Sequence, residues 1–335
     1  MRYLTACFVL LTAALAHGLT PEGSFVVGQG TQQVTVLGTG DFARIQPVFA
    51  GFVQRSSDHS VRYIQASSRE IDQAVRAGLP PEIDVVMSSA VDLQVRLIND
   101  GFGQSLSDEL TNSTNWRGEL IQWALEPIVT LVNRRLVGDD VDRLSSRSAL
   151  IQWLKNQERS GLTATLYDPR QSGVGYLLSQ QDLLQDTQFW ELIDQLARHQ
   201  LRPNCCSGDM IDQVVSGESA LAYNVIESYV TPRLERAPDI RILRFNDYQL
   251  AIPRTGFVPR EANDRDLALD LLAYFVSDEG QARLSPTVRL AVLNRPNAGG
   301  PIKPIRLSPA LIVHLDPVAR DDFFRVWDQR SQRAQ

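Results

Sequence analysis

Hydrophobic and polar residues alternate along this chain in two rhythms, which predict strands followed by helices. Short runs rich in β-branched residues are typical of buried strands, and apolar residues that recur every three to four positions mark one face of a helix. The strands predicted in this way cover residues 34–37, 61–66, 84–87, 128–132, 163–167, 220–223 and 248–252. The predicted helices cover residues 70–77, 91–99, 148–157, 189–197, 210–215, 267–276 and 317–327, and a further helix starts near Ile45. This alternation predicts an α/β fold with mixed, mostly parallel sheets flanked by helices.

Chain length and composition indicate two lobes. Of the residues, 43% are hydrophobic and 21% are charged, a composition that is ordinary for a folded protein. A chain of 335 residues is longer than one typical domain. No repeat or low-complexity segment interrupts the pattern. We therefore expect two α/β lobes, each with its own sheet.

The first 18 residues have the pattern of an export signal. Arg2 gives a short positive start, residues 4–16 are almost wholly apolar, and Ala14, Ala16 and Gly18 suit cleavage near residues 16–18. The alternative is a buried helix or a membrane anchor, but the run is shorter than the ~20 residues that span a bilayer. We therefore expect a periplasmic protein from which the signal peptide, residues 1–18, is removed.

The charge distribution argues against nucleic acid as a partner. The formal net charge is -6, and no basic block is present that could follow a phosphate backbone. Only two of the 33 cationic residues are lysines, Lys155 and Lys303. The arginines that make up the rest have a planar fork suited to carboxylates and phosphates.

Two adjacent cysteines remain once the predicted signal peptide, with Cys7, is removed. Cys205 and Cys206 can form a disulfide bond in an oxidising compartment, or they can stay as two thiols in the loop of residues 203–208. The sequence leaves both states open. His199 is the only histidine near them in sequence, and a zinc site needs four ligands, so we expect no metal.

Four turns after predicted strands carry hydroxyl groups or glycines. They contain Thr39, Gly40 and Asp41; Ser67 and Ser68; Ser88 and Ser89; and Arg170, Ser172 and Gly173. In open α/β sheets, ligands bind at the carboxyl edge, where such turns meet. Each serine taken alone suits a simple helix cap. Together the turns present mainly donors, which predicts a ligand cleft for an anion or a polyol.

The first of these turns also matches a dinucleotide-binding pattern. Residues 38–43, Gly-Thr-Gly-Asp-Phe-Ala, satisfy G-x-G-x-x-G/A directly after a strand. The acidic residue expected at the end of the next strand is missing, because that strand ends in Gln65-Ala66-Ser67-Ser68. We therefore expect no nucleotide cofactor and interpret the turn as a source of backbone N–H donors.

Arg170 is the strongest single candidate for a ligand contact. It precedes Ser172 and Gly173 at a predicted helix start, where the helix dipole is positive and the guanidinium group offers two parallel hydrogen bonds. The alternative is a surface ion pair between Arg170 and Asp168.

No catalytic constellation accompanies the predicted cleft. The sequence has neither a G-x-S-x-G elbow nor an H-E-x-x-H helix, and His59, His199 and His314 lie far apart without a nucleophile motif. The sequence therefore predicts a binding protein, with no enzymatic activity and no cofactor.

Three stretches resemble the periplasmic solute-binding proteins of ABC importers. They are residues 84–90, residues 168–176 and residues 217–224, and the order and spacing of these loose motifs carry the similarity, which spans most of residues 30–290. The match is to extracellular solute-binding family 1, which includes ferric-ion, sugar-phosphate and phosphoglycerate binders. The resemblance adds Tyr223 and Asn224, at the end of the third stretch, to the candidate ligand-binding residues.

Membership implies two lobes that close around a ligand, in a type II binding-protein fold with a hinge of two crossing strands. Residues 30–130 with 245–300 would form the first lobe, residues 131–244 the second, and residues 301–335 a C-terminal segment with the final helix. The strands would cross near residues 128–133 and between Tyr223 and Tyr248. Iron-binding members use a tyrosine pair where this chain has residues 225–227, Val-Ile-Glu, between Tyr223 and Tyr229, which disfavours ferric ion.

The sequence therefore predicts a monomeric, non-enzymatic protein that captures a small organic or phosphorylated anion and delivers it to a membrane permease. The alternatives are a ferric-ion or other solute-binding protein of the same family, and a sensor subunit that docks on a histidine kinase.

Overall fold

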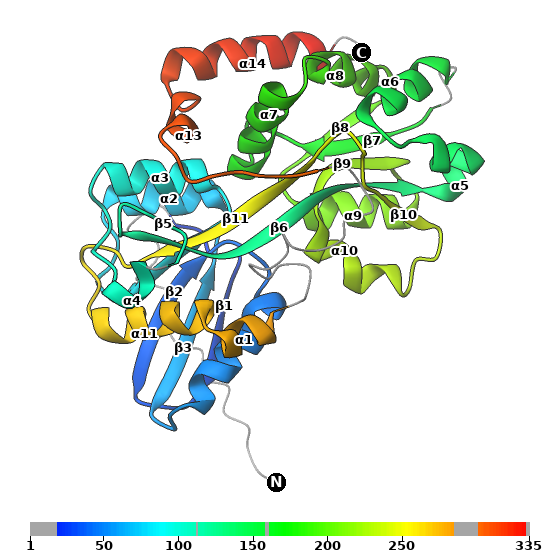
Figure 1. Ribbon diagram of the computed structural model, residues 1–335. Helices are drawn as coiled ribbons and strands as arrows, with labels where there is room; N and C mark the ends of the chain where they lie inside the picture. Colours follow the sequence, from blue (N-terminus) through cyan, green and yellow to red (C-terminus); the bar gives the residue numbers. More distant parts are fainter. Residues whose placement is uncertain (1–18, 112, 158–160, 285–300, 333–335) are drawn as a thin grey trace.

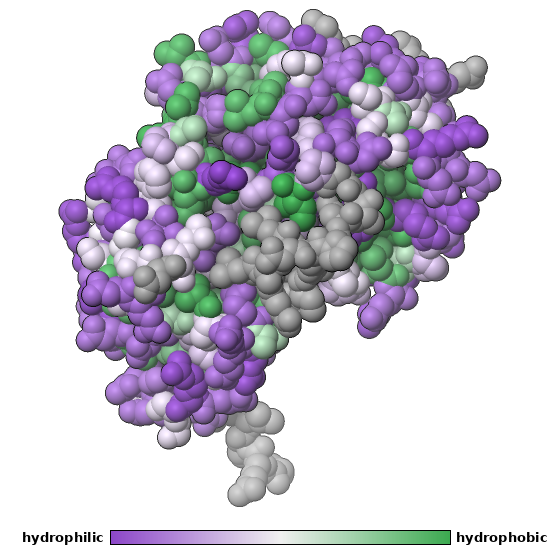
Figure 2. Space-filling model, in the orientation of Figure 1, coloured by the Kyte–Doolittle hydropathy of each residue, from purple (hydrophilic) through white to green (hydrophobic). Residues whose placement is uncertain are grey.

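The predicted alternation of strands and helices folds into two α/β lobes joined by long strands (Figure 1). The computed structural model describes residues 19–111, 113–157, 161–284 and 301–332, so the predicted signal peptide lies outside the described residues. No helix in these ranges combines the length and the apolar character needed to cross a membrane. Hydrophilic side chains cover most of the visible outer face of both lobes (Figure 2).

Lobe 1 is built on the strand order β1-β3-β2-β4-β11-β6. Strands β3, β2 and β4 are parallel, and the pairs β1–β3, β4–β11 and β11–β6 are antiparallel. Its strands are β1 (Gly23–Gly28), β2 (Gln32–Gly38), β3 (His59–Gln65), β4 (Val85–Ser88), β5 (Asn115–Trp116), β6 (Leu120–Asn133) and β11 (Gln249–Phe257). Its helices are α1 (Phe42–Gln54), α2 (Ser68–Ala77), α3 (Val91–Asn99), α4 (Asp108–Thr111), α11 (Arg265–Val276) and α12 (Asp278–Arg283).

Lobe 2 continues the same sheet in the order β6-β9-β7-β8, with β10 on the other side of β6. Strands β9, β7 and β8 are parallel. The strands that belong to lobe 2 alone are β7 (Ala164–Tyr167), β8 (Leu201–Asn204), β9 (Leu221–Ile226) and β10 (Ile240–Leu243). Its helices are α5 (Arg134–Val137), the 3₁₀ helix η2 (Gly138–Arg143), α6 (Arg147–Asn156), α7 (Gly173–Gln185), α8 (Phe189–Arg198), α9 (Ser207–Ser216) and α10 (Glu227–Leu234).

Strands β6 and β11 connect the lobes. The first half of β6, residues 121–127, pairs with β11, and the second half, residues 128–132, pairs with β9 of lobe 2. The chain returns to lobe 1 between β10 and β11. The two lobes and their connecting strands agree with the fold class predicted from the sequence.

The C-terminal segment crosses between the lobes once more. It consists of β12 (Ile302–Pro304), α13 (Ala310–Val313) and α14 (Pro317–Ser331), and we call residues 301–332 the C-terminal strap. Strand β12 pairs with β11, α13 packs on α3 of lobe 1, and α14 packs on α8 of lobe 2 (Figure 1). The strap therefore touches both lobes.

Two hydrophobic clusters form most of the core. One lies in lobe 1 and includes Phe49, Phe52 and Phe275 from α1 and α11. The other runs from α2 and α3 of lobe 1 through β6 into lobe 2 and reaches Phe323 and Trp327 of the strap. The lobes and the strap thus share buried apolar surface, which is the main stabilising contribution to folding.

Helix α1 begins earlier than the sequence predicted. It starts at Phe42 rather than near Ile45, because the Asp41 side chain accepts a hydrogen bond from the Ala43 N–H group and caps the first turn. Pro47 lies inside the helix rather than in its first turn. Strands β1, β5, β8, β10 and β12 were not predicted, and each lies at an edge of the sheet or is short.

Candidate functional site

A cleft between the lobes lies at the carboxyl ends of the parallel strands and has two chambers. The first, which we call the turn chamber, has a volume of about 330 Å³, and its lining includes Thr39, Gly40, Asp41, Ser67, Ser68, Ser89, Tyr167, Ser172, Cys205, Cys206, Ser207, Tyr229 and Arg233. The second, the arginine chamber, has a volume of about 390 Å³, and its lining includes Gly40, Asp41, Arg44, Trp123, Glu126, Ser228, Tyr229, Arg233 and Arg254. The chambers share Gly40, Asp41, Tyr229 and Arg233, so they form one continuous site.

Helix starts from both lobes line the turn chamber. Ser67 caps α2, where its Oγ accepts a hydrogen bond of 3.3 Å from the Glu70 N–H group. Ser172 caps α7 in the same way, at 3.1 Å from the Gly175 N–H group. Each serine uses its oxygen as an acceptor, which leaves the hydroxyl hydrogen free to donate. Positive helix ends and donor hydroxyls favour a negatively charged ligand.

A buried ion pair on the connecting strands forms the floor of the arginine chamber. Glu126 of β6 accepts a hydrogen bond from Nε of Arg254 on β11, and both residues are at most 5% exposed. Burial alone would lower the pKa of Arg254, but Glu126 and the Tyr229 hydroxyl raise it above its usual range. The guanidinium group therefore stays charged.

This ion pair contacts both lobes. Nη1 of Arg254 donates to the carbonyl oxygen of Thr39 in lobe 1 at 3.2 Å. In lobe 2, Nη2 of Arg254 donates to the Tyr229 hydroxyl at 3.3 Å, and Ser228 donates to Glu126 Oε2 at 2.6 Å. Movement of one lobe against the other must change these hydrogen bonds.

Tyr229 and Arg44 meet across the cleft. The Tyr229 hydroxyl accepts a hydrogen bond of 3.2 Å from the Asp41 N–H group, and the Arg44 guanidinium lies 4.6 Å from the centre of the Tyr229 ring. Burial lowers the pKa of Arg44, although Tyr229, Glu126 and Asp41 raise it in part. Within the described residues Arg44 forms no ion pair, so its charge is available to a ligand.

Six of the predicted binding residues line the turn chamber. They are Thr39, Gly40, Asp41, Ser67, Ser89 and Ser172. Thr39 and Ser89 come from adjacent turns and are joined by a hydrogen bond of 3.2 Å from the Ser89 N–H group to Thr39 Oγ1. The structure thus brings these turns together, as the strand order requires.

Two predicted residues lie just outside the cleft. Ser88 is 3% exposed, and its Oγ accepts a hydrogen bond from the Ala90 N–H group, so it shapes the turn from within. Gly173 lies where α7 meets α2: a Cβ atom there would come within 2.7 Å of Ser68 Oγ. Gly173 therefore permits close contact between the lobes and does not line either chamber.

The prediction for Arg170 needs a correction. Its guanidinium group forms an ion pair with Asp328 of α14 and lies 4.5 Å from the centre of the Phe324 ring. Asp168 accepts a hydrogen bond from the backbone N–H group of Arg170, so the alternative ion pair with Asp168 is not formed either. The strap holds this side chain, and Arg170 lines neither chamber of the cleft.

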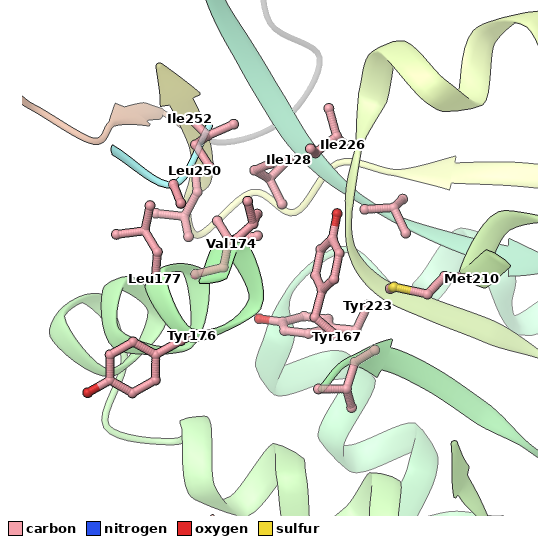
Figure 3. Close-up of a cluster of buried hydrophobic side chains, with 14 of the residues drawn as sticks. Ile128, Tyr167, Val174, Tyr176, Leu177, Met210, Tyr223, Ile226, Leu250 and Ile252 are labelled. Atoms are coloured by element: carbon pink, nitrogen blue, oxygen red, sulfur yellow. The ribbon is translucent and has the colours of Figure 1, made fainter. Parts of the chain in front are cut away.

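Tyr223 and Asn224 also need a correction, because both belong to a buried network of lobe 2. The Tyr223 hydroxyl accepts from Arg147 Nε at 2.8 Å and donates to Asp182 at 3.0 Å. Asn224 Nδ2 donates to the same carboxylate at 2.6 Å, and the Tyr248 hydroxyl donates to it at 2.8 Å. We call these five residues the lobe 2 network. Figure 3 shows Tyr223 among apolar side chains that include Ile128 and Ile226.

Sequence reasoning missed the arginine chamber. Arg44, Glu126 and Arg254 come from three segments whose proximity depends on the crossing of β6 and β11, and nothing local in the sequence marks it. Ser207 was detectable in part, since it lies just before the helix predicted at residues 210–215, but strand β8 in front of it was not predicted. Its Oγ accepts a hydrogen bond from the Ile226 N–H group and bonds the Tyr167 hydroxyl in the wall of the turn chamber.

Cys205 and Cys206 are joined in a disulfide bond in the wall of the turn chamber. Of the two states that the sequence left open, the structure has the oxidised one. With Asp209 they form a group whose donor atoms lie within 4.8 Å of one another, but the sulfurs are not thiolates while the bond is intact.

The fold and the cleft at the strand ends define a two-lobed solute-binding protein. Residues 34–286 match the model of the bacterial extracellular solute-binding proteins, family SBP_bac_11, and the chain belongs to this family. The resemblance expected from the sequence is confirmed in this respect. No curated protein matches the sequence.

Three solved structures illustrate the proteins of similar fold. The substrate-binding protein of an ABC transporter from Agrobacterium tumefaciens is 26% identical, with a TM-score of 0.82, 93% of this chain covered and 100% of that chain. Iron-bound HitA from Pseudomonas aeruginosa is 15% identical, with a TM-score of 0.67 and coverages of 89% and 99%. AfuA from Actinobacillus pleuropneumoniae, with fructose-6-phosphate bound, is 12% identical, with a TM-score of 0.68 and coverages of 91% and 100%.

Proposed function

We propose that this protein is the periplasmic solute-binding component of an ABC importer and that it captures a small organic or phosphorylated anion in the cleft between its lobes. The main support for an anionic solute is Arg44, whose half-buried guanidinium group lines the arginine chamber and forms no ion pair among the described residues. The similarity to an ABC-transporter protein from Agrobacterium tumefaciens supports the transport role.

The chambers suit a solute of modest size. Their volumes of about 330 and 390 Å³ fall at the lower end of the range for small-molecule sites, roughly 300–1,000 Å³. A phosphate or carboxylate group would bind near Arg44, where charge-assisted hydrogen bonds are strongest, and hydroxyl groups would face Ser67 and Ser172. Asp41 could accept hydrogen bonds from such hydroxyl groups.

Capture by closure follows from the contacts between the lobes. Tyr229 of lobe 2 holds the Asp41 backbone of lobe 1, and Arg254 links both to the connecting strands. An entering solute must part these contacts, and they can form again once the solute is enclosed. This is a hinge motion of the kind that two-lobed binding proteins undergo.

Thermal unfolding in the presence of a panel of organic acids and sugar phosphates tests whether the solute is an anion. A ligand at 100 times its dissociation constant stabilises the folded protein by about 2.7 kcal/mol. Arg44→Gln should abolish this shift, whereas Arg170→Gln, which changes an arginine outside the cleft, should keep it. Stabilisation by neutral sugars or by cations alone, or a visible colour on addition of ferric ion, would contradict an anion as the solute.

Uptake by cells separates transport from sensing. Deletion of the gene should stop import of the stabilising solute, and the Arg44→Gln variant should fail to restore it. Loss of a transcriptional response with normal import would instead assign the protein to a histidine kinase.

A further inference from the structure

A small cavity behind the cleft is lined by lobe 1, lobe 2 and the strap. Its volume is about 140 Å³, and we call it the strap cavity. The residues that matter in it are Arg69, Asp72, Asp92, Arg96, Tyr176 and Arg320. It shares no lining residue with either chamber of the cleft.

Asp92 is a buried carboxyl group in this cavity with an unpartnered oxygen. It lies in the first turn of α3, is 2% exposed, and its Oδ1 atom has no hydrogen-bond partner in the described part of the chain. Burial raises its pKa to about 7, although backbone N–H groups at the helix start, Arg96 and Arg320 lower it in part. A buried polar atom without a partner is costly, so Asp92 indicates that the cavity holds something.

Three arginines surround the same space, and two of them, Arg69 and Arg320, have no carboxylate partner among the described residues. Arg320 of α14 lies 5.2 Å from the centre of the Tyr176 ring, and Arg69 of α2 donates to the carbonyl oxygen of Arg170; neither forms an ion pair within the described residues. Nη2 of Arg96 donates a hydrogen bond of 2.9 Å to Asp72, but Nε of Arg96 is buried without a partner among the described residues. Asp72 is already paired with both Arg76 and Arg96.

We propose that the strap cavity binds a small oxyanion, of the size of sulfate, phosphate or a carboxylate, between Arg69, Arg96 and Arg320 and next to the unpartnered Oδ1 atom of Asp92. The bound anion would tie α2 and α3 of lobe 1 to the strap. The cavity volume is several times the roughly 30 Å³ that one water molecule occupies in the liquid, so the cavity has room for such an ion.

The charged groups that face Asp92 predict the effect of pH. Arg69 and Asp72 come from α2, Arg96 from α3, Tyr176 from α7 and Arg320 from α14, and His314 follows α13. Burial raises the pKa of Tyr176 to about 12, so its hydroxyl stays neutral near pH 7, and burial lowers the pKa of His314, which favours its neutral form. Asp92 is then the group that changes charge, and its ionisation places a negative charge beside the anion. Affinity should fall as pH rises through the pKa of Asp92.

Sulfate is the probe that tests this proposal, because its charge is constant between pH 6 and 8. Calorimetric titration at fixed ionic strength should show binding to the parent protein about tenfold tighter at pH 6 than at pH 8. Asp92→Asn should bind with equal affinity at both values, since its side chain stays neutral. Arg320→Gln should lose about tenfold or more at pH 6. Arg325→Gln, on the same helix but paired with Asp322, should behave as the parent.

Arg44→Gln distinguishes this site from the cleft. The variant should bind sulfate as the parent does, and loss of binding would place the anion in the arginine chamber instead. Absence of sulfate binding in the parent, binding independent of pH, or equal affinities in Arg320→Gln and Arg325→Gln would overturn the proposal and leave the cavity to water. If no organic acid or sugar phosphate of the panel stabilised the protein, the proposed function would fail, but the test of sulfate binding in the strap cavity would be unaffected.

Discussion

Two buried arginines in this protein form ion pairs with similar partners but serve different purposes. Arg147 lies in the lobe 2 network, where it contacts Asp182 and the hydroxyl of Tyr223, and it also pairs with Asp247, just before β11. Arg254 lies on a connecting strand, and its contacts reach Thr39 in lobe 1 and Tyr229 in lobe 2. The first arrangement holds a lobe together, and the second changes whenever the lobes move.

Each of these arginines is hydrogen-bonded to a tyrosine, Arg147 to Tyr223 and Arg254 to Tyr229, and the two tyrosines have unrelated roles although they are close in sequence. Tyr223 is 2% exposed in a cluster of buried apolar side chains (Figure 3). Tyr229, in the first turn of α10, instead lines both chambers of the cleft. The difference arises because β9 buries its side chains on both faces and α10 begins at the strand's carboxyl end. Ligand contacts belong to the end of such a strand rather than to its interior.

The largest effect should come from removing the carboxylate of the lobe 2 network. Asp182→Ala leaves Arg147 buried without one of its partners and frees three donors, so we expect a loss of about 3–5 kcal/mol in the free energy of unfolding. Urea denaturation measures this loss. Asp328→Ala, which removes an exposed ion pair, is the control and should cost less than about 1 kcal/mol. Equal losses in the two variants would mean that the network does not stabilise lobe 2.

Asp92 offers the opposite case, a buried carboxyl group whose removal should stabilise the protein. Burial raises its pKa to about 7, from an ordinary value of roughly 4. A raised pKa in the folded state means that stability falls as pH rises between these two values and stays lower above them. Asp92→Asn should therefore be more stable than the parent by about 2–3 kcal/mol at pH 8 and nearly equal at pH 4. Denaturation at both pH values, without added oxyanions, would show this. A stability difference that does not depend on pH would refute the raised pKa.

Tyr223→Phe removes one hydroxyl group from the lobe 2 network. The group links Arg147 to Asp182, and hydrogen bonds to charged groups are strong, so the variant should lose about 1–2 kcal/mol of stability. Its affinity for the stabilising solute should not change, because Tyr223 lines neither chamber. Altered solute affinity at unchanged stability would return Tyr223 to the binding site that the sequence suggested.

The sequence was sufficient for the fold and for one wall of the cleft. Parallel strands bring their following turns to one edge, so the turns that hold Thr39, Ser67, Ser89 and Ser172 were expected to meet, and they do. Side-chain directions were not predictable in this way. Arg170 turns towards Asp328 because the strap returns 158 positions later in the chain, and no local pattern encodes that contact.

The arginine chamber was out of reach for a related reason. Glu126 and Arg254 are 128 positions apart and meet only because β6 and β11 pair antiparallel with a register shift at Arg254. Periodicity predicted only residues 128–132 and 248–252 of these strands, which leave out Glu126 and Arg254, and it could not predict the register, which depends on the packing of the whole sheet. Sequence reasoning therefore missed Glu126 and Arg254, although it did single out Asp41, another charged residue of the cleft.

Tyr229→Phe should have the smallest effect on stability and the sharpest effect on binding. Its hydroxyl accepts two hydrogen bonds, from the Asp41 N–H group and from Arg254, beside a cleft that water can enter, so the unliganded protein should lose only about 0.5 kcal/mol. In the closed, liganded form the same contacts are enclosed and count for more, and we expect solute affinity to fall about tenfold. Calorimetric titration and urea denaturation of both variants check the contrast: Tyr223→Phe should change stability without changing affinity, and Tyr229→Phe should change mainly affinity. If both variants changed the same quantity, the distinction between a network within one lobe and a contact between lobes would fail.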